Sequence, residues 1–418
     1  MFTALSARPV HLAVQDAPHM IISDKKATRD HTKLHNRRLV FTSIYRNQQI
    51  SRAEIARATD LTATTVSSVV SDLVAEGLVL EEASVPLTKG KPPILLSVNK
   101  NHRCILCLDL TSSSFRGAIT NLGGEVQNRI RISNRGQTGD EALAAAFAVA
   151  DALLASVAGS VMGIGVGSPG VVDPGTGIVR RAVNFGWRDL PLRDLLSDRY
   201  KLPTYVANAS HAAVLAEYVF GRHKNTPDLV VVKVDHEVGA GIILNGQLFL
   251  GHGDGAGDIG HVRAVENGEP CTCGNSGCLE TLCSSRAIVK RARAIARDDP
   301  GSLLHSFATH EEELDIDAVV RAYEAGDRAV GALVADVGHY LAVALSHLVG
   351  VLSVPWVLIA GSIANFGEPL MSAIDQEVRR RSFVSVLSQT SVERDSLGPD
   401  IVILGAAALF LHYHVGVM

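Results

Sequence analysis

Residues 261–280 read His261-Val-Arg-Ala-Val-Glu-Asn-Gly-Glu-Pro-Cys271-Thr-Cys273-Gly-Asn-Ser-Gly-Cys278-Leu-Glu280 and bring one imidazole and three thiols close together in the sequence. Zn²⁺ takes four nitrogen and sulfur ligands in a tetrahedron, and a closed Cys₃His set is typical of a structural site. The alternative is a buried loop of unrelated small residues, but four soft ligands rarely gather without a metal. The pattern therefore predicts a structural zinc ion held by His261, Cys271, Cys273 and Cys278.

Cysteine usage outside this segment predicts a reducing compartment. The 418-residue chain has six cysteines, so only Cys104, Cys107 and Cys283 remain. Three thiols do not make a disulfide framework, and we expect a cytoplasmic protein.

The sequence predicts neither a signal peptide nor a membrane-spanning helix. Residues 1–24 lack the basic and apolar regions of a signal peptide, and we expect a loosely ordered leader there. The most apolar stretch, 340–364, contains His347 and Pro355, which favours a buried helix followed by a core strand over a spanning helix.

Charge separates the start of the chain from the remainder. Between Lys25 and Lys100, twelve Lys and Arg stand against seven Asp and Glu, whereas the whole chain carries a net charge of −4. A basic segment alone is weak support for nucleic-acid binding, because most charge runs are solvated surfaces.

The same basic segment has the pattern of a helix-turn-helix. Residues 34–46 predict a basic amphipathic helix, and Ser51-Arg-Ala-Glu54 is a capping box that starts a short helix over 51–58. After the turn Asp60-Leu61, Thr62 caps a second helix whose valines and Leu73 recur at core spacing. Two such helices joined by a short turn predict a helix-turn-helix.

Two apolar runs, 78–80 and 94–96, then bracket a basic loop and predict a hairpin, which makes residues 25–100 a winged helix-turn-helix. In that module the second helix enters the major groove and a cationic wing reaches phosphates. The alternative is a three-helix interaction module that does not bind DNA. The candidate contacts to double-stranded DNA are Arg37, Arg38, Arg52, Thr62, Thr64, Thr65, Ser68, Lys89 and Lys91. The second helix has no Arg, Asn or Gln for bidentate base contacts, so phosphate contacts should dominate affinity.

Alternating apolar strands and Gly-rich turns begin at Cys104. The order βββαβα, repeated from Leu229, predicts two α/β lobes with a cleft between them, over residues 101–225 and 226–418. This is the two-lobed architecture of sugar kinases and their actin-like relatives.

Several motifs resemble the ROK family of repressors, open reading frames and kinases over nearly the whole chain. Asp258-Ile-Gly-His261 with the cysteine segment is similar to that family's zinc and sugar signature. Val238-Gly-Ala-Gly241 resembles its second phosphate loop, Ile359-Ala-Gly361 its adenosine-side segment, and Asn184-Phe-Gly-Trp187 a sugar-contacting turn.

The resemblance implies which residues contact a sugar. These are Asn184, Asn208, Asp258, His261 and Glu280, with Gly167 and Pro169 in the pocket wall. Amide and carboxylate groups suit a polyol because each can bond a pair of hydroxyls. Asp258 stands where the family usually has Glu, so either the ligand differs or a water completes the contact.

Three departures from the family's kinases argue against catalysis. The position of the catalytic Asp is Ala209, which cannot accept the proton of a sugar hydroxyl. The first phosphate loop reads Asp109-Leu-Thr-Ser-Ser and has lost both glycines, and the second begins Asp235-His-Glu237, whose carboxylates should repel phosphates. His211 is close in sequence, but we interpret it as a helix-face histidine.

The sequence thus predicts a non-enzymatic, sugar-responsive transcriptional regulator, a repressor, that acts on operator DNA as a homodimer or homotetramer and has no membrane partner. One alternative is a sugar kinase with a displaced general base. The other is a ligand-independent DNA-binding regulator controlled by a protein partner.

Overall fold

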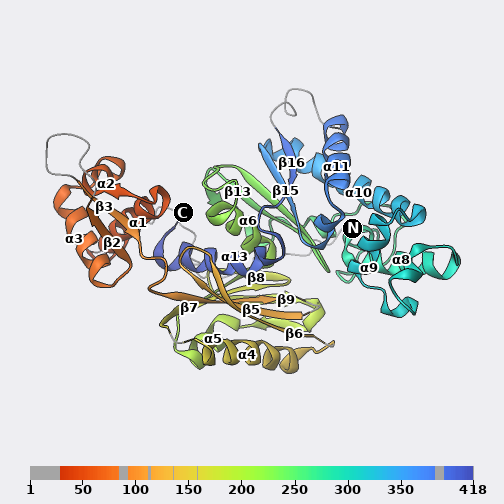
Figure 1. Ribbon diagram of the computed structural model, residues 1–418, viewed down its shortest axis with the longest axis horizontal. Coiled ribbons are helices and arrows are strands. Elements are labelled where there is room, and N and C mark those ends of the chain that lie inside the picture. Colours follow the sequence, from red (N-terminus) through yellow and green to blue (C-terminus); the bar gives the residue numbers. More distant parts are fainter. Residues whose placement is uncertain are drawn as a thin grey trace, which may run out of the picture.

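The computed structural model describes residues 29–83, 93–111, 114–134, 136–157, 159–381 and 390–417. They form a small N-terminal head and two larger α/β lobes (Figure 1). The head contains α1 (Arg29–Asn47), α2 (Arg52–Thr59), α3 (Ala63–Ala75), β1 (Ile50–Ser51), β2 (Val79–Ala83) and β3 (Ile94–Val98). Its three strands pair in the order β1-β3-β2, so the predicted hairpin is confirmed.

Local capping begins both short helices of the head. The Ser51 amide donates to Glu54 Oε2 at 2.8 Å, and the Ser51 hydroxyl accepts from the Glu54 amide, which confirms the capping box. Thr62 caps α3 by accepting from the Thr65 amide at 3.2 Å. Asp60 between them has a left-handed backbone, which makes the turn tight.

The first lobe is built on a five-stranded sheet of order β11-β7-β4-β5-β6. A helix follows the first three strands, then a further strand and helix, as the sequence predicts. The bounds are β4 (Cys104–Leu110), β5 (Ser114–Asn121), β6 (Val126–Ser133), α4 (Gly139–Ala155), β7 (Val161–Ser168), α5 (Leu192–Tyr200) and β11 (Thr204–Asn208). A small second sheet contains β8 (Val171–Asp173), β9 (Ile178–Ala182) and β10 (Trp187–Leu190).

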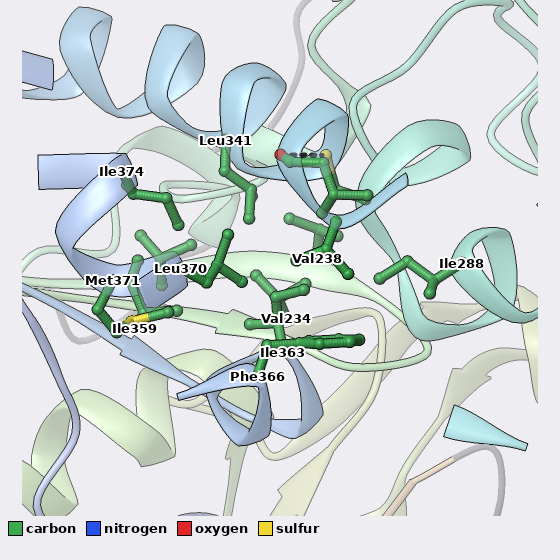
Figure 2. Packing of buried hydrophobic residues seen from close by; sticks show 14 of the residues in the cluster. Val234, Val238, Ile288, Leu341, Ile359, Ile363, Phe366, Leu370, Met371 and Ile374 are labelled. Atoms are coloured by element: carbon green, nitrogen blue, oxygen red, sulfur yellow. Dashed lines mark hydrogen bonds between the residues drawn. The ribbon is translucent and has the colours of Figure 1, made fainter. Parts of the chain in front are cut away.

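The second lobe has a sheet of order β14-β13-β12-β15-β16, covered by helices whose apolar side chains meet the strands in one core (Figure 2). The strands are β12 (Leu229–Val234), β13 (Val238–Leu244), β14 (Gln247–Leu248), β15 (Trp356–Ala360) and β16 (Ser391–Arg394). The helices include α8 (Ser285–Asp298), α9 (Ile316–Glu324), α10 (Arg328–Leu352) and α11 (Glu368–Arg381).

Two segments among the described residues are long and apolar enough to span a membrane, α10 and 398–415. Half of the apolar window of α10 and 67% of that of 398–415 are buried inside the fold, so both serve as core elements. The predicted buried helix followed by a core strand is confirmed by α10 and β15.

Two helices lie between the sheets of the lobes, α6 (Ala209–Phe220) and α13 (Ile401–Phe410). α6 packs on β12 and β13, and α13 packs on β4, β7 and β11 (Figure 1). They approach closely at Gly405, where a Cβ atom would lie 2.1 Å from the carbonyl oxygen of Ala212. The predicted boundary places 401–417 in the second lobe; α13 packs on the sheet of the first lobe and also shares a buried cluster with β12 and β15 of the second.

The C-terminal segment also holds the head. A π-helical turn, η8 (Leu411–Val415), follows α13 and contacts α1. Arg38 Nη2 donates to Tyr413 O at 2.9 Å, Thr42 Oγ1 donates to Gly416 O, and Tyr45 Oη donates to Leu122 O at 2.7 Å. Apolar residues of α1 share one buried cluster with α13, so the head is packed against the body.

Candidate functional site

The four predicted metal ligands form a compact group. The nitrogen of His261 and the sulfurs of the three cysteines all lie within 4.8 Å of one another. Cys271 Sγ is 3.6 Å from His261 Nδ1, and Cys273 Sγ is 3.7 Å from Cys278 Sγ. A tetrahedron with Zn–S bonds of about 2.3 Å has S–S edges of about 3.8 Å, so the spacing fits this ion.

Loop geometry brings these ligands together. The short helix η3 (Ile259–His261) presents the imidazole, and a tight turn in which the Cys271 amide donates to Asn275 O at 2.7 Å presents two of the thiols. The Leu279 amide then donates to Val262 O at 2.9 Å. Glu280, the residue after Leu279, begins the short helix α7 (Glu280–Cys283). The pairing of Leu279 with Val262 therefore positions Glu280.

Asn184 and Glu280, two of the predicted sugar residues, both interact with Glu237, which the sequence places in the second phosphate loop. Asn184 Nδ2 donates to Glu237 Oε1 at 2.6 Å. The buried Glu280 accepts from the Val238 amide at 3.2 Å, and its carboxylate interacts electrostatically with Glu237. Burial raises the pKa of Glu237 above its usual range, and Lys233 opposes that shift.

Asn208 is placed at the start of α6 in the same region. Its side-chain oxygen accepts from the Ser210 amide at 2.7 Å, and its nitrogen donates to Gly170 O at 2.6 Å. Gly170 has a φ of +75°, and a Cβ there would lie 2.0 Å from the carbonyl oxygen of Arg181. The turn that contacts Asn208 therefore requires glycine.

Asp258 and His211 are linked through the loop that precedes η3; His211 lies in the first turn of α6. Asp258 is exposed and precedes η3, within electrostatic range of His261 and His211. His211 is buried, and its Nε2 contacts Ala256 O at 3.0 Å. A carbonyl oxygen only accepts, so Nε2 carries the proton, and burial lowers the pKa of this ring. His211 thus holds the loop that carries Asp258.

A cleft of about 840 Å³ opens between the lobes beside this group. Ala209, Pro169 and Glu237 line it, together with residues of both predicted phosphate loops. None of the five predicted sugar residues, Asn184, Asn208, Asp258, His261 and Glu280, is among its lining residues. The polar groups of Asn184, Asn208 and Glu280 bond to neighbouring protein groups.

The carboxylates of the phosphate loops are paired, which differs from the expected repulsion of phosphates. Lys233 Nζ lies 2.8 Å from Asp235 Oδ2; burial alone would lower the Lys233 pKa, but Asp235 and Asp109 hold it above the usual range. The pKa of Asp235 is lowered by the same partner, against burial. Asp109 is buried and forms an ion pair with Arg116. Glu237 accepts a hydrogen bond from Asn184, so each of the three loop carboxylates has a partner.

The head presents α3 on its outer side, away from the lobes (Figure 1). Thr62, Thr64 and Ser68 are exposed, whereas Thr65 is half-buried and its hydroxyl lies 2.9 Å from that of Thr62. The valines on the opposite face are buried, so the predicted orientation of the helix agrees with its burial.

The basic residues predicted to contact DNA have different environments. Arg37 donates to both carboxylate oxygens of Glu76, at 2.7 and 2.6 Å, and Arg52 pairs with Glu81. Arg38 departs from the prediction: its guanidinium donates to Tyr413 O and faces the body of the protein. Lys89 and Lys91 lie outside the described residues.

Comparisons with known proteins agree with both parts of this structure. The model of the ROK family matches residues 105–413, and a model described as winged helix-turn-helix DNA-binding matches residues 34–79. The chain is 28% identical to the xylose repressor of Caldicellulosiruptor bescii over 91% of this chain and 97% of that protein. It is 26% identical to the DNA-binding transcriptional dual regulator NagC of Escherichia coli over 88% and 90% of the two chains.

A solved structure extends the likeness to the arrangement of the parts. It is a ROK family transcriptional regulator described as a homolog of the E. coli MLC protein, with a TM-score of 0.81, 26% identity and coverage of 93% of this chain and 98% of that one. The predicted two-lobed fold with a winged head is thereby confirmed. Because the family model spans about three quarters of the sequence, the chain belongs to the ROK family.

Proposed function

We propose that this protein is a cytoplasmic transcriptional regulator, a repressor, that binds operator DNA through its head and responds to a sugar that it does not phosphorylate. The observation that carries the proposal is an exposed α3 in a head packed on a sugar-kinase-like body whose catalytic position is Ala209. The name of one relative, a xylose repressor, supports both halves, and the name of the other, a DNA-binding transcriptional dual regulator, supports the DNA half.

The DNA half rests on α3 and the charges beside it. α3 enters the major groove with Thr62, Thr64, Thr65 and Ser68 toward the DNA, and Arg37 and Arg52 reach phosphates. Both arginines have acidic partners on the surface, but an exposed ion pair is worth no more than about 1 kcal/mol, so phosphates can displace those partners. Lys89 and Lys91 would extend the contact through the wing.

The sugar half rests on the group around Glu237. Asn184, Asn208, Asp258, His261 and Glu280 would bind the hydroxyls of the effector. Zinc bound by His261 and the three cysteines would fix the loop between His261 and Glu280. Because Nδ1 of His261 faces the thiols, its Nε2 would remain as a hydrogen-bond donor to the sugar.

Two features support the proposed lack of kinase activity. Alanine at 209 cannot take the proton from an attacking hydroxyl. Asp109, in the first phosphate loop, is buried in an ion pair with Arg116 and is not free to serve a nucleotide-bound cation. Coupled ATP-hydrolysis assays with a panel of sugars test this. We expect background rates, and sugar-dependent turnover near about 1 s⁻¹ would establish the kinase alternative.

The DNA half is tested by fluorescence anisotropy with DNA selected from the genome by the protein. Binding should weaken steeply with salt, and Lys89→Ala with Lys91→Ala should flatten the slope of log K against log[salt] by up to about 2. Thr64→Ala should change the preference among operator variants more than the slope. A wing double variant with unchanged affinity and slope would remove the wing from the contact.

The sugar half is tested by thermal unfolding with the same sugar panel, since a ligand of the folded state raises its stability. Sugars that stabilise the protein should also change its DNA affinity, by re-spacing the heads of a homodimer or homotetramer. DNA binding that no sugar alters would instead support control by a protein partner.

A further inference from the structure

Glu237 joins the two lobes in this structure. Asn184, which donates to Glu237 Oε1 at 2.6 Å, lies between β9 and β10 in the first lobe, whereas Glu237 lies between β12 and β13 in the second. The backbone amide of Gly170, also in the first lobe, donates to the same carboxylate. The Glu237 side chain of the second lobe therefore accepts hydrogen bonds from two groups of the first lobe.

The neighbouring polar groups are similarly engaged within the protein. The Asn208 amide donates to Gly170 O, and Glu280 accepts from the Val238 amide. A sugar that enters beside Glu237 must replace the Asn184–Glu237 hydrogen bond, which costs affinity unless its own hydroxyls donate to the carboxylate that is released. Hydroxyl and ammonium groups can donate in this way; a phosphate or carboxylate only accepts.

The negative charge of the Glu237 carboxylate also disfavours an anionic ligand. Glu237 is half-buried and interacts with the buried Glu280, so an anionic substituent would meet two carboxylates. Two cations of this region have partners: Lys233 Nζ lies 2.8 Å from Asp235 Oδ2, and Arg286 Nη2 lies 3.6 Å from Glu280 Oε1. Poorly solvated like charges repel more strongly than they would in water.

We propose that Glu237 selects the effector by its charge, an inference that rests on the proposed sugar-sensing function. The effector is then an unphosphorylated, non-acidic sugar, either neutral or bearing an amino group. The Asn184–Glu237 hydrogen bond holds the lobes in the ligand-free protein, and such a sugar replaces it with bonds to both side chains. The basic side chains that line the cleft beside Glu237, among them Arg116, Arg131 and Lys233, do not serve the effector's substituents.

Two variants separate charge from hydrogen bonding at this position. Glu237→Gln keeps an oxygen that can accept from Asn184 but removes the negative charge. Asn184→Ala removes the donor and leaves the carboxylate in place. Both are made in the full-length protein, and thermal unfolding without ligand verifies that each one folds.

Affinities are measured calorimetrically for matched ligands: xylose, glucose and glucosamine, each against its phosphate ester, and glucose against glucuronate. In the wild type the free sugar should bind at least tenfold more tightly than its anionic counterpart. Glu237→Gln should reduce this ratio below about threefold, whereas Asn184→Ala should weaken both ligands and keep the ratio. The tenfold bound corresponds to the scale of like-charge repulsion at a partly solvated site.

Equal or tighter binding of a phosphate ester or glucuronate by the wild type would overturn the inference, as would an unchanged ratio in Glu237→Gln. If that variant does not fold, the wild-type ratio alone decides. Binding of no ligand in either class would instead show that the body does not sense sugars, which overturns the proposed function first.

Discussion

At the scale of single residues, Cys273 offers the most direct test of the metal group. It is the only half-exposed cysteine of the three, so its replacement disturbs packing least. We expect the wild type to contain one zinc per chain and Cys273→Ser to lose it, because serine does not replace a thiolate ligand of this ion. Elemental analysis measures the content, and thermal unfolding should show a lower midpoint for the variant.

Cys104→Ser is the matched control, since Cys104 is buried outside the metal group. It should retain the full metal content. A wild type purified without metal that unfolds at the same temperature after zinc is added would contradict the prediction.

Residue patterns predicted the metal group well and the sugar group incompletely. The four metal ligands lie within eighteen residues, so their types and spacing alone indicate a site. The sequence places Glu237 in a phosphate loop, whereas in the structure it accepts a hydrogen bond from Asn184 of the other lobe. Nothing in the local sequence of Glu237 indicates this contact between lobes. Arg38 was assigned to DNA for a similar reason: its partner, Tyr413, is 375 residues away.

At the scale of elements, the turn η8 contains a titratable group that should make the head's attachment depend on pH. Burial lowers the pKa of His412 to about 4, with a smaller contribution from Arg38. The unfolded value is higher, so the neutral ring stabilises the fold above about pH 6.5, and that stability is lost as pH falls toward 4. Between pH 7 and pH 5 the loss should be about 2 kcal/mol.

Denaturant unfolding at several pH values measures this loss. His412→Phe keeps a buried ring without a proton site and should remove most of the difference attributable to His412. His347→Phe on the exposed side of α10 should leave the pH dependence unchanged. If His412→Phe follows the wild type at every pH, the ring is not buried neutral in solution.

Elements set by local chemistry were predictable, and those set by docking were not. The capping box, the cap at Thr62 and the hairpin strands follow from adjacent residues. The π-helical turn does not, because it forms where the last residues of the chain meet α1, its earliest described helix. The position of α13 between the lobes, in contact with strands of both, depends on docking for the same reason.

At the scale of the whole molecule, α6 and α13 connect the cleft with the head. α6 begins at Asn208 and Ala209 and ends near Tyr218, whose hydroxyl accepts from Arg46 of α1 at 3.3 Å. α13 begins with Ile401, which lines the cleft, and leads into the turn beneath α1. A change in lobe angle would therefore move the surface on which the head is packed. Weakening the junction between α1 and the body tests this coupling.

Thr42→Val combined with Tyr45→Phe removes two hydrogen bonds between α1 and the body while keeping the shapes of both side chains. Sugar affinity should be unchanged, because neither residue is near Glu237. The factor by which a saturating sugar changes DNA affinity should fall by up to about thirtyfold, since the two bonds together contribute roughly 2 kcal/mol to the attachment. Thr59→Val, which removes a bond to Ile55 O inside the head, should keep the full response.

Linkage requires DNA to alter sugar affinity by the same reduced factor in the double variant, so anisotropy titrations in both directions provide the check. An undiminished response in that variant would show that the heads are repositioned through contacts between subunits. The packing of α1 against the lobes of its own chain would then not transmit the signal.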